Sequence, residues 1–374
     1  MNSNIIPQTP DLQWLNSFVH ESLVKAPGYE LDAPDIKIKL DQNESPWDWP
    51  SDLKAAILKE LSNAAWNRYP QPFPIELQRM VAKHVGVAPE NILLSPGSNH
   101  LISVLLNVFT QNNTGKVVIA RPSFPLYEAH CRYMGIAYEP WCLNDSFDYD
   151  LQLLPDLTPG SIVLFASPNN PTGTSLSYKA FESLLLKYPK VLFMADEAYF
   201  EFAEEPYTPL LEKYNNLILI RTFSKTLGTA GLRLGYMVGH QSYIELTRKL
   251  MLPFTINVMT DVALRYILNH SDAKKILEKN INNAKNERSF LYNKLLDLSK
   301  KQNFKVKASE ANFLLVQWPT NESGLAAYGQ LVAKGILVRN VTRGPGLAGC
   351  LRITVGTREE NLALLAVLTD FSGA

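Results

Sequence analysis

The chain has 374 residues, of which 46% are hydrophobic and 19% charged, a composition typical of globular proteins. Its formal net charge is zero, so charge gives no reason to expect nucleic acid or an anionic membrane as a partner. No apolar run approaches the ~20 residues that a membrane-spanning helix needs. The opening MNSNIIPQTPDLQ has neither a basic region nor an apolar signal core, so we expect a cytoplasmic protein.

Cysteine and histidine usage argues against a disulfide framework and against a metal site. Cys131, Cys142 and Cys350 are odd in number and share no CxxC spacing, which is typical of reduced thiols. The six histidines never approach the spacing of metal ligands. We therefore predict an enzyme without a bound metal.

Strand and helix patterns alternate along the chain. Residues 51–66 show helical apolar spacing, with Ser51 expected as the N-cap. Short apolar runs that end in turn residues follow, and such runs are typical of strands buried on both faces of a mostly parallel sheet. Helical segments such as 177–188 lie between them, and a long helix is expected over 272–300. The expected strands lie within 91–98, 116–125, 161–173, 190–200, 217–225 and 232–239, with two more at 313–318 and 350–356.

This order of elements predicts an α/β fold with two domains. We assign residues 46–255 to a large α/β domain and residues 256–374 to a smaller α+β domain. Residues 1–45 are expected to form an N-terminal arm and part of the small domain. No internal repeat or low-complexity segment interrupts this organisation.

Polar side chains follow the expected strands at the points where those strands end. Open α/β sheets bind ligands at the carboxyl ends of their strands, so these side chains are candidates for a common site. Each alone has a simpler role, since a lysine can reach solvent and a carboxylate can cap a helix. Their joint occurrence favours one site. The set comprises Ser98, Phe124, Tyr127, Asn170, Asp196, Glu197, Tyr199, Thr222, Ser224, Lys225 and Arg233.

Pyridoxal 5′-phosphate is the cofactor whose needs match this set. It takes a lysine as a Schiff base, a carboxylate at its ring nitrogen and an anion site for its phosphate. Asp196 would keep the ring nitrogen protonated, so that the ring accepts electrons. A poorly solvated setting beside Arg233 would help Lys225 to lose its proton. The phosphate site would comprise Thr222, Ser224, Arg233 and the backbone N–H groups near Ser98.

Six motifs in order carry a family resemblance over most of the chain. They are KLDQNESP near residue 40, NRYP at 67–70, PNNPTG at 168–173, DEAYFEF at 196–202, the SK…GLRLG segment, and LRITVGTREEN, which ends at residue 361. By these motifs the chain resembles the fold-type I aminotransferases, and among them the histidinol-phosphate aminotransferase family. The resemblance implies a large domain whose mostly parallel seven-stranded sheet is sandwiched by helices.

The resemblance also implies roles for single residues. Lys225 would be the Schiff-base lysine and proton shuttle, and Asp196 the partner of the pyridinium nitrogen. Asn170 and Tyr199 would hydrogen-bond the phenolic oxygen of the ring, with Tyr199 part of the catalytic set, and Tyr127 would stack on the ring face. The phosphate would be held by Ser98, Asn99, Thr222, Ser224 and Arg233, and by Tyr69 of the other subunit, which implies a homodimer with shared sites.

Substrate anchors are implied in the C-terminal part of the chain. Arg352 would grip the anionic group of the substrate, with Arg339 as a second cation or, equally, a surface arginine. A guanidinium suits both phosphate and carboxylate. Asn43 would contact the substrate end. The implied reaction converts L-histidinol phosphate and 2-oxoglutarate into imidazole acetol phosphate and L-glutamate by a ping-pong cycle of histidine biosynthesis.

Alternatives remain open within and beyond this cofactor class. An aromatic amino acid aminotransferase is one, because KAPGYELD at 25–32 carries its aromatic residue, Tyr29, after Pro-Gly instead of before it. A phospho-amino-acid decarboxylase of the same fold is another. A nucleotide-dependent dehydrogenase is disfavoured, because GTAGLRLG lacks the G-x-G-x-x-G order after a first strand. A non-catalytic regulatory relative is disfavoured by the intact set of lysine, aspartate and arginine.

Overall fold

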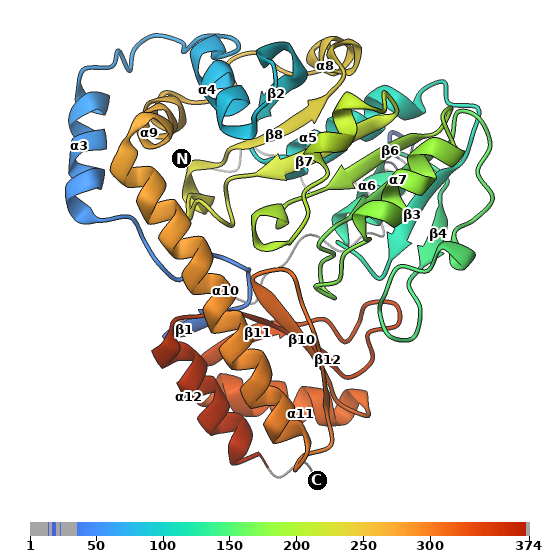
Figure 1. Ribbon diagram of the computed structural model, residues 1–374, viewed down its shortest axis with the longest axis vertical. Coiled ribbons are helices and arrows are strands. Elements are labelled where there is room, and N and C mark those ends of the chain that lie inside the picture. Colours follow the sequence, from blue (N-terminus) through green and yellow to red (C-terminus); the bar gives the residue numbers. More distant parts are fainter. Residues whose placement is uncertain (1–13, 15–16, 20–22, 24–35, 372–374) are drawn as a thin grey trace, which may run out of the picture.

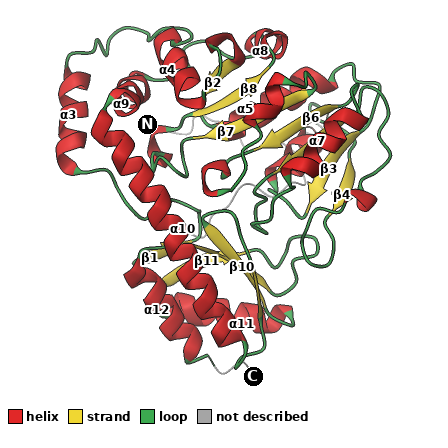
Figure 2. Ribbon diagram, viewed as in Figure 1, coloured by secondary structure: helices red, strands yellow, loops and turns green. Residues whose placement is uncertain are grey.

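The computed structural model describes residues 14, 17–19, 23 and 36–371. Most of the N-terminal arm expected from the sequence, and the segment 25–32, lie outside these residues. The described part forms a large unit and a small unit, each with its own sheet (Figures 1 and 2). No helix in that part of the chain is long and apolar enough to cross a membrane.

The large unit is built on a seven-stranded sheet of order β2-β8-β7-β6-β5-β3-β4. β8 runs antiparallel to both of its neighbours, and the other pairings are parallel. The predicted mostly parallel seven-stranded sheet is confirmed, although β4 was not among the strands expected from the sequence. The strands are β2 (Ile92–Ser95), β3 (Val117–Arg121), β4 (Glu139–Cys142), β5 (Ile162–Ala166), β6 (Leu192–Asp196), β7 (Leu217–Thr222) and β8 (Gly235–Gly239).

Helices cover both faces of this sheet, and alternate strand residues enter two separate apolar clusters. Leu217 and Leu219 of β7 belong to the first cluster, whereas Ile218 and Ile220 belong to the second. Side chains of a strand alternate between faces, so burial of both faces requires the continuous apolar runs seen in the sequence. The first face is covered by α3 (Ser51–Ser62), α4 (Ile75–Val85), α7 (Tyr178–Lys187) and α9 (Val258–Asn269), and the second by α5 (Ser98–Thr110), α6 (Leu126–Tyr133) and α8 (Gln241–Arg248).

The small unit has a five-stranded sheet of order β1-β11-β12-β10-β9. β1 comes from the N-terminal side of the chain and pairs in parallel with β11, so residues near 40 belong to this unit. The strands are β1 (Ile38–Leu40), β9 (Lys305–Lys307), β10 (Phe313–Gln317), β11 (Ile336–Asn340) and β12 (Cys350–Thr354), and the helices are α10 (Ser271–Ser299), α11 (Asn321–Ala333) and α12 (Arg358–Thr369). Short 3₁₀ turns complete the described chain: η1 (Pro89–Asn91), η2 (Leu151–Leu153), η3 (Phe200–Phe202), η4 (Thr208–Glu212) and η5 (Ala230–Leu232).

Two helix termini show what local sequence can and cannot indicate. Ser177 caps α7 by accepting a hydrogen bond from the backbone N–H of Ala180. The expected cap at Ser51 is wrong, because Pro50 occupies the N-cap position of α3 and makes no side-chain cap bond. Proline has its φ already restricted, so it can begin a helix without a capping side chain.

The packing of α9 favours a later boundary between the two units than the sequence predicts. The sequence-based boundary after residue 255 assigns α9 to the C-terminal domain. Its side chains Ala263, Leu264 and Ile267 instead lie in the first apolar cluster of the large unit. In Figure 1, α10 runs from the neighbourhood of α9 to the small unit, and its later residues Leu291 and Leu295 pack in the small-unit core. We therefore propose that the second domain begins within α10.

Candidate active site

The carboxyl ends of six strands of the large sheet lie at one edge. β3, β4, β5, β6 and β7 are mutually parallel, and β2 has the same direction because both β2 and β7 run antiparallel to β8. Asp196, the last residue of β6, is in register with Ala166 of β5 and Ile220 of β7. The loops that follow these strands therefore lie at the same edge, where the sequence placed the candidate residues.

Asp196 is a buried carboxylate held by neutral donors. The hydroxyl of Tyr127 donates to Asp196 Oδ2 at 2.6 Å, and the backbone N–H of Ala198 donates to Oδ1 at 3.1 Å. Burial raises the pKa of the Asp196 carboxyl to about 6, and these two hydrogen bonds oppose the rise. Within the described residues no cationic side chain pairs with Asp196. A cationic ligand atom would lower the cost of keeping it ionised.

Lys225 follows β7 and points toward the small unit, not into bulk solvent. Its Nζ donates to the backbone carbonyl of Gln42 at 2.8 Å, across the junction between the two units. The pKa of the Lys225 ammonium is lowered to about 8, mainly by burial and also by the nearby cations Arg352 and Arg233, while the carboxylates of Glu44 and Asp41 oppose the change. An amine with such a pKa can lose and regain a proton near neutral pH.

An anion site forms where α5 begins. Gly97 precedes the helix with φ of 96°, and a Cβ there would lie 2.6 Å from Nη2 of Arg233, so the guanidinium lies directly against this helix terminus. Arg233 Nη1 also lies 3.4 Å from Ser224 Oγ, and Thr222 Oγ1 donates to the same oxygen at 3.0 Å. Free N–H groups of a helix terminus, hydroxyls and a guanidinium suit a phosphate. Ser98 is buried in the first turn of α5, and Asn99 beside it is exposed.

Arg352 of β12 connects the small unit to the large one. Its Nη1 donates to Asn170 Oδ1 at 2.6 Å, and its Nη2 donates to the backbone carbonyl of Asp41. Its guanidinium also lies over the ring of Phe313, 5.5 Å from the centroid. Because Asn170 accepts through its oxygen, the hydrogens of its amide nitrogen remain available for another acceptor.

Asn43 lies at the same junction. It is 1% exposed and its Nδ2 donates to the hydroxyl oxygen of Tyr199 at 2.9 Å. The hydroxyl of Thr354 donates to Asn43 Oδ1 at 3.1 Å, and Asn312 donates to its backbone carbonyl at 3.0 Å. Tyr199 accepts this bond and keeps its own proton, because burial raises its pKa. Sequence reasoning did not select Thr354 or Asn312, because only their contacts with Asn43 in the folded chain identify them.

Arg339 and Tyr69 take different positions relative to this set. Arg339 of β11 is in register with Arg352 of β12, so the two side chains share one face of the small sheet. Tyr69 is not brought to the other candidates within the chain. Its side chain is 83% exposed and contacts Phe254, with ring centroids 4.9 Å apart.

Tyr127 differs from its expected role. Its ring is fully buried in the second apolar cluster, and its hydroxyl is committed to Asp196. A ring in that position is not free to stack on a ligand face. Phe124, which packs edge-on against Tyr127 with centroids 5.6 Å apart, is only partly buried. We therefore propose Phe124 as the residue that faces the cofactor ring, and Tyr127 as a donor that orients Asp196.

The donor set fits pyridoxal 5′-phosphate. Asp196 is a buried carboxylate with no cationic partner among the described residues, and Asn170 and Tyr199 each retain a hydrogen-bond donor. Lys225 has a lowered pKa, and the start of α5 forms an anion site. These are the four requirements of the cofactor: ring nitrogen, phenolic oxygen, aldehyde carbon and phosphate.

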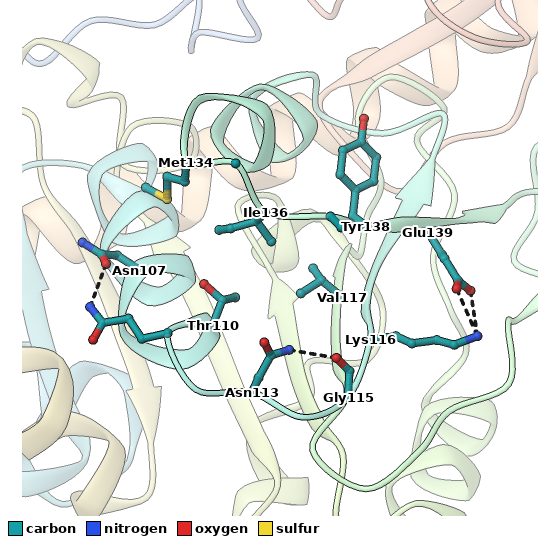
Figure 3. A pocket seen from close by; sticks show the side chains of 13 residues that line it. Asn107, Thr110, Asn113, Gly115, Lys116, Val117, Met134, Ile136, Tyr138 and Glu139 are labelled. Carbon is teal, nitrogen blue, oxygen red and sulfur yellow. Dashed lines mark hydrogen bonds and ion pairs between the residues drawn. The ribbon is translucent and has the colours of Figure 1, made fainter. Parts of the chain in front are cut away.

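A separate hollow of about 610 Å³ lies near the starts of β3 and β4 (Figure 3). Its lining includes Asn107, Lys116 and Glu139, and Lys116 forms an ion pair with Glu139 at 3.0 Å in which both side chains are partly exposed. None of the candidate site residues lines it. A solvent-exposed ion pair of this kind contributes little free energy, so it gives no reason to assign a catalytic function to this hollow.

Comparison with known proteins agrees with this geometry. Residues 35–368 match the family described as aminotransferase class I and II. The chain is 34% identical to a histidinol-phosphate aminotransferase of Thermococcus gammatolerans, over 92% of this chain and 95% of the relative. The structure is also similar to that of a histidinol-phosphate aminotransferase from Clostridium acetobutylicum, with a TM-score of 0.79, 22% identity, and coverage of 89% of this chain and 98% of the other. A decarboxylase from Sulfurospirillum multivorans has a TM-score of 0.75 at 27% identity, with coverage of 90% and 95%.

The family match spans both units of the fold and all the candidate residues from Asn43 to Arg352. The seven-stranded sheet, the buried Asp196 and the lysine with a lowered pKa lie within it. The chain therefore belongs to the aminotransferase class I and II family.

Proposed function

We propose that the protein is a pyridoxal-phosphate-dependent aminotransferase that transfers the amino group of L-histidinol phosphate to 2-oxoglutarate. The full-length relatives bearing that enzyme's name support the substrate. The observation that carries the chemistry is the combination of Lys225, with its lowered pKa, and Asp196, a buried carboxylate without a cation among the described residues.

When bound, pyridoxal 5′-phosphate supplies a ring that takes up the electron pair left when a proton leaves the amine-bearing carbon. Asp196 would hold a proton on the ring nitrogen, since an ionised carboxylate in a poorly solvated site favours a neighbouring cation. Asn170 and Tyr199 would donate to the phenolic oxygen. The start of α5, Ser224 and Arg233 would hold the phosphate.

Lys225 would hold the cofactor through its amine and, once released by the incoming substrate, move the proton from the amine-bearing carbon. Its pKa of about 8 leaves a useful fraction of neutral amine at neutral pH. Burial at the junction of the two units would exclude water and strengthen the electrostatic contacts of the site.

Arg352 and Arg339 support a phosphorylated donor. Their register on adjacent strands puts both side chains on one face of the small sheet, so the two guanidinium groups could share a group carrying two negative charges. The same pair can bind the carboxylates of 2-oxoglutarate in the second half of the cycle. Aromatic amino acids carry a single carboxylate and would form fewer ion pairs with these two arginines.

A homodimer with shared sites is part of the proposal. Tyr69 is highly exposed, and so are the side chains of Trp66 and Leu252, so covering them with a second copy of the chain would remove apolar surface from water. Tyr69 of a partner could then complete the phosphate site. A cytoplasmic location is also proposed, supported by three free cysteines.

A donor screen tests the function. The purified protein with bound pyridoxal 5′-phosphate is mixed with histidinol phosphate, phenylalanine or tyrosine, without 2-oxoglutarate, and the visible absorbance of the cofactor is followed. Conversion to the amine form at the lowest concentration is expected with histidinol phosphate. Faster conversion by an aromatic amino acid would favour an aromatic aminotransferase.

Lys225→Ala provides the matched control for the chemistry. Turnover is expected to fall at least ~10³-fold, because the residue that moves the proton is lost, while cofactor binding at the anion site persists. Unchanged turnover in this variant would contradict the proposal. Release of carbon dioxide from a phosphorylated amino acid, at a rate above transamination, would instead identify a decarboxylase.

A further inference from the structure

A buried polar network lies on the face of β6 and β7 opposite to Asp196. Arg221 of β7 is 1% exposed and donates to Glu197 Oε2 through Nε at 2.8 Å and through Nη2 at 2.6 Å. Its Nη2 also donates to Thr208, and its guanidinium lies 3.8 Å from the ring centroid of Phe200. The mechanism above uses none of these groups.

Glu201 joins this network to the loop that carries Lys225. The hydroxyl of Thr226 donates to Glu201 Oε2, and Thr226 is only 3% exposed. Thr226 is the residue directly after Lys225. Glu201 lies in η3, two residues after Tyr199, so this one contact joins two segments that both contribute to the site.

The chain on either side of this contact is fixed at other points. Phe200 is held under the guanidinium of Arg221, and Glu197 is paired with that same guanidinium.

Burial raises the pKa of the Glu201 carboxyl to about 7, while the bond from Thr226 and the charge of Arg221 oppose the rise and Glu197 adds to it. The Thr226 hydroxyl is therefore a main source of stabilisation for the ionised form of Glu201.

We propose that Glu201 is a positioning residue for Lys225, acting through the hydroxyl of Thr226. The contact holds the backbone after Lys225 against η3 and so sets where the lysine amine lies relative to Tyr199 and Asp196. Proton transfer depends steeply on such placement, since a displacement of about 1 Å can cost on the order of 10²-fold in rate. The inference rests on the proposed function of Lys225.

Four variants test this role in the protein with bound pyridoxal 5′-phosphate, three in the loop of Lys225 and one in η3. Thr226→Val removes the hydroxyl at nearly constant volume, and Thr226→Ser restores it. Thr229→Val is the matched control, because the hydroxyl of Thr229 is also buried but donates to the backbone carbonyl of Phe223 at 3.1 Å, not to a carboxylate. Glu201→Gln keeps the size of the acceptor and removes its charge.

Two readouts separate positioning from general loop stability. The first is the pH midpoint of the visible absorbance of the bound cofactor, which reports the environment of the Lys225 nitrogen. The second is kcat against KM with histidinol phosphate. Thr226→Val is expected to shift the midpoint by at least ~0.5 pH unit and to lower kcat about tenfold or more, with KM changed less than ~2-fold. Thr226→Ser should keep the midpoint within about 0.3 pH unit of the wild type and kcat within about twofold. Glu201→Gln should change the midpoint and kcat in the same direction as Thr226→Val.

Equal effects of Thr226→Val and Thr229→Val, or no recovery in Thr226→Ser, would overturn the positioning role while leaving the proposed function intact. If Thr226→Val does not fold, an unshifted midpoint in Glu201→Gln would overturn it as well. A wild-type protein whose cofactor absorbance does not respond to histidinol phosphate would instead overturn the proposed function, and this inference with it.

Discussion

Asp196 and Glu197 are consecutive carboxylates at the end of one strand, and the structure gives them opposite surroundings. Asp196 faces the second apolar cluster and receives hydrogen bonds from Tyr127 and a backbone N–H. Glu197 faces the other side, where Arg221 donates two hydrogen bonds to one of its oxygens and both side chains are 1% exposed. Because neighbours along a strand point to opposite faces, one residue step separates the two environments.

The difference indicates a division of labour between the two acids. Glu197 has its counter-charge built into the fold, so it stabilises the arrangement of β6, β7 and η4 but has little left to offer a ligand. Asp196 has no cationic partner among the residues described, and burial raises its pKa to about 6. A buried acid kept in this condition costs stability, and a cationic ligand atom can recover that cost.

Arg221→Leu should have the largest effect, and on stability. It would leave Glu197 buried without its counter-charge, which typically costs about 3–5 kcal/mol in the free energy of unfolding. Chemical denaturation of the cofactor-free variant would measure this loss. The control is the double variant Glu197→Leu with Arg221→Leu, which should recover most of it, and a double variant as unstable as the single one would contradict the interpretation.

Asp196→Asn should have the next largest effect, on activity. The amide cannot hold a proton on the cofactor ring nitrogen by charge, so turnover should fall by about 10²–10³-fold. Steady-state kinetics with histidinol phosphate and 2-oxoglutarate would show this. Turnover within tenfold of the wild type would contradict the catalytic role of Asp196 and would indicate that it mainly stabilises the fold, as Glu197 does.

The stability of the cofactor-free protein should depend on pH through Asp196. Its pKa in the folded state, about 6, lies above the ordinary 3.8, so the folded form holds this proton more tightly than the unfolded chain. The stabilisation is fully present below about pH 4 and is lost as the pH rises through about 6. Asp196→Asn should therefore become more stable relative to the wild type between pH 4.5 and 7.5, by roughly 2 kcal/mol.

Unfolding measured at several pH values without cofactor would check this sign. If the stability of Asp196→Asn relative to the wild type stays constant across the range, or decreases as the pH rises, then burial does not raise the pKa of Asp196. Asp196→Asn would then lower turnover without the gain in stability that we expect above pH 4.5.

Tyr127→Phe should have the smallest effect. The hydroxyl donates to Asp196 and opposes the rise of its pKa, so its removal should raise that pKa further. The loss of one buried hydrogen bond should lower the free energy of unfolding at pH 7.5 by about 1 kcal/mol. The upper end of the pH range over which the cofactor-free protein loses stability should move upward, and a downward movement would contradict the assigned hydrogen bond.

Much of the large unit could be predicted from local patterns. The strands β2, β3, β5, β6, β7 and β8 coincide with the apolar runs, and Asp196 and Lys225 stand at strand ends as expected. β4 carries a proline and a tryptophan in only four residues, EPWC, and offers no apolar run to recognise. The spacing of apolar residues identifies a strand only where the strand is long and uniformly buried.

Partners distant in the sequence could not be predicted in the same way. Asn43 reaches Tyr199 across 156 positions, and Arg352 reaches Asn170 across 182. The proposal of Phe124 instead of Tyr127 as the ring-facing residue also depends on tertiary contacts, because both residues follow the same strand.

The amino-acid sequence by itself determined the α/β order, the lysine and the aspartate at strand ends, and the motifs of the aminotransferase family. Those features depend on residues close together in the sequence, because the spacing of apolar residues and the preferences of turn residues are local properties. Only the tertiary structure decided which of two adjacent carboxylates receives an arginine and to which unit α9 belongs. Charge pairing and core packing join distant segments, and their free energies depend on burial that no local pattern contains.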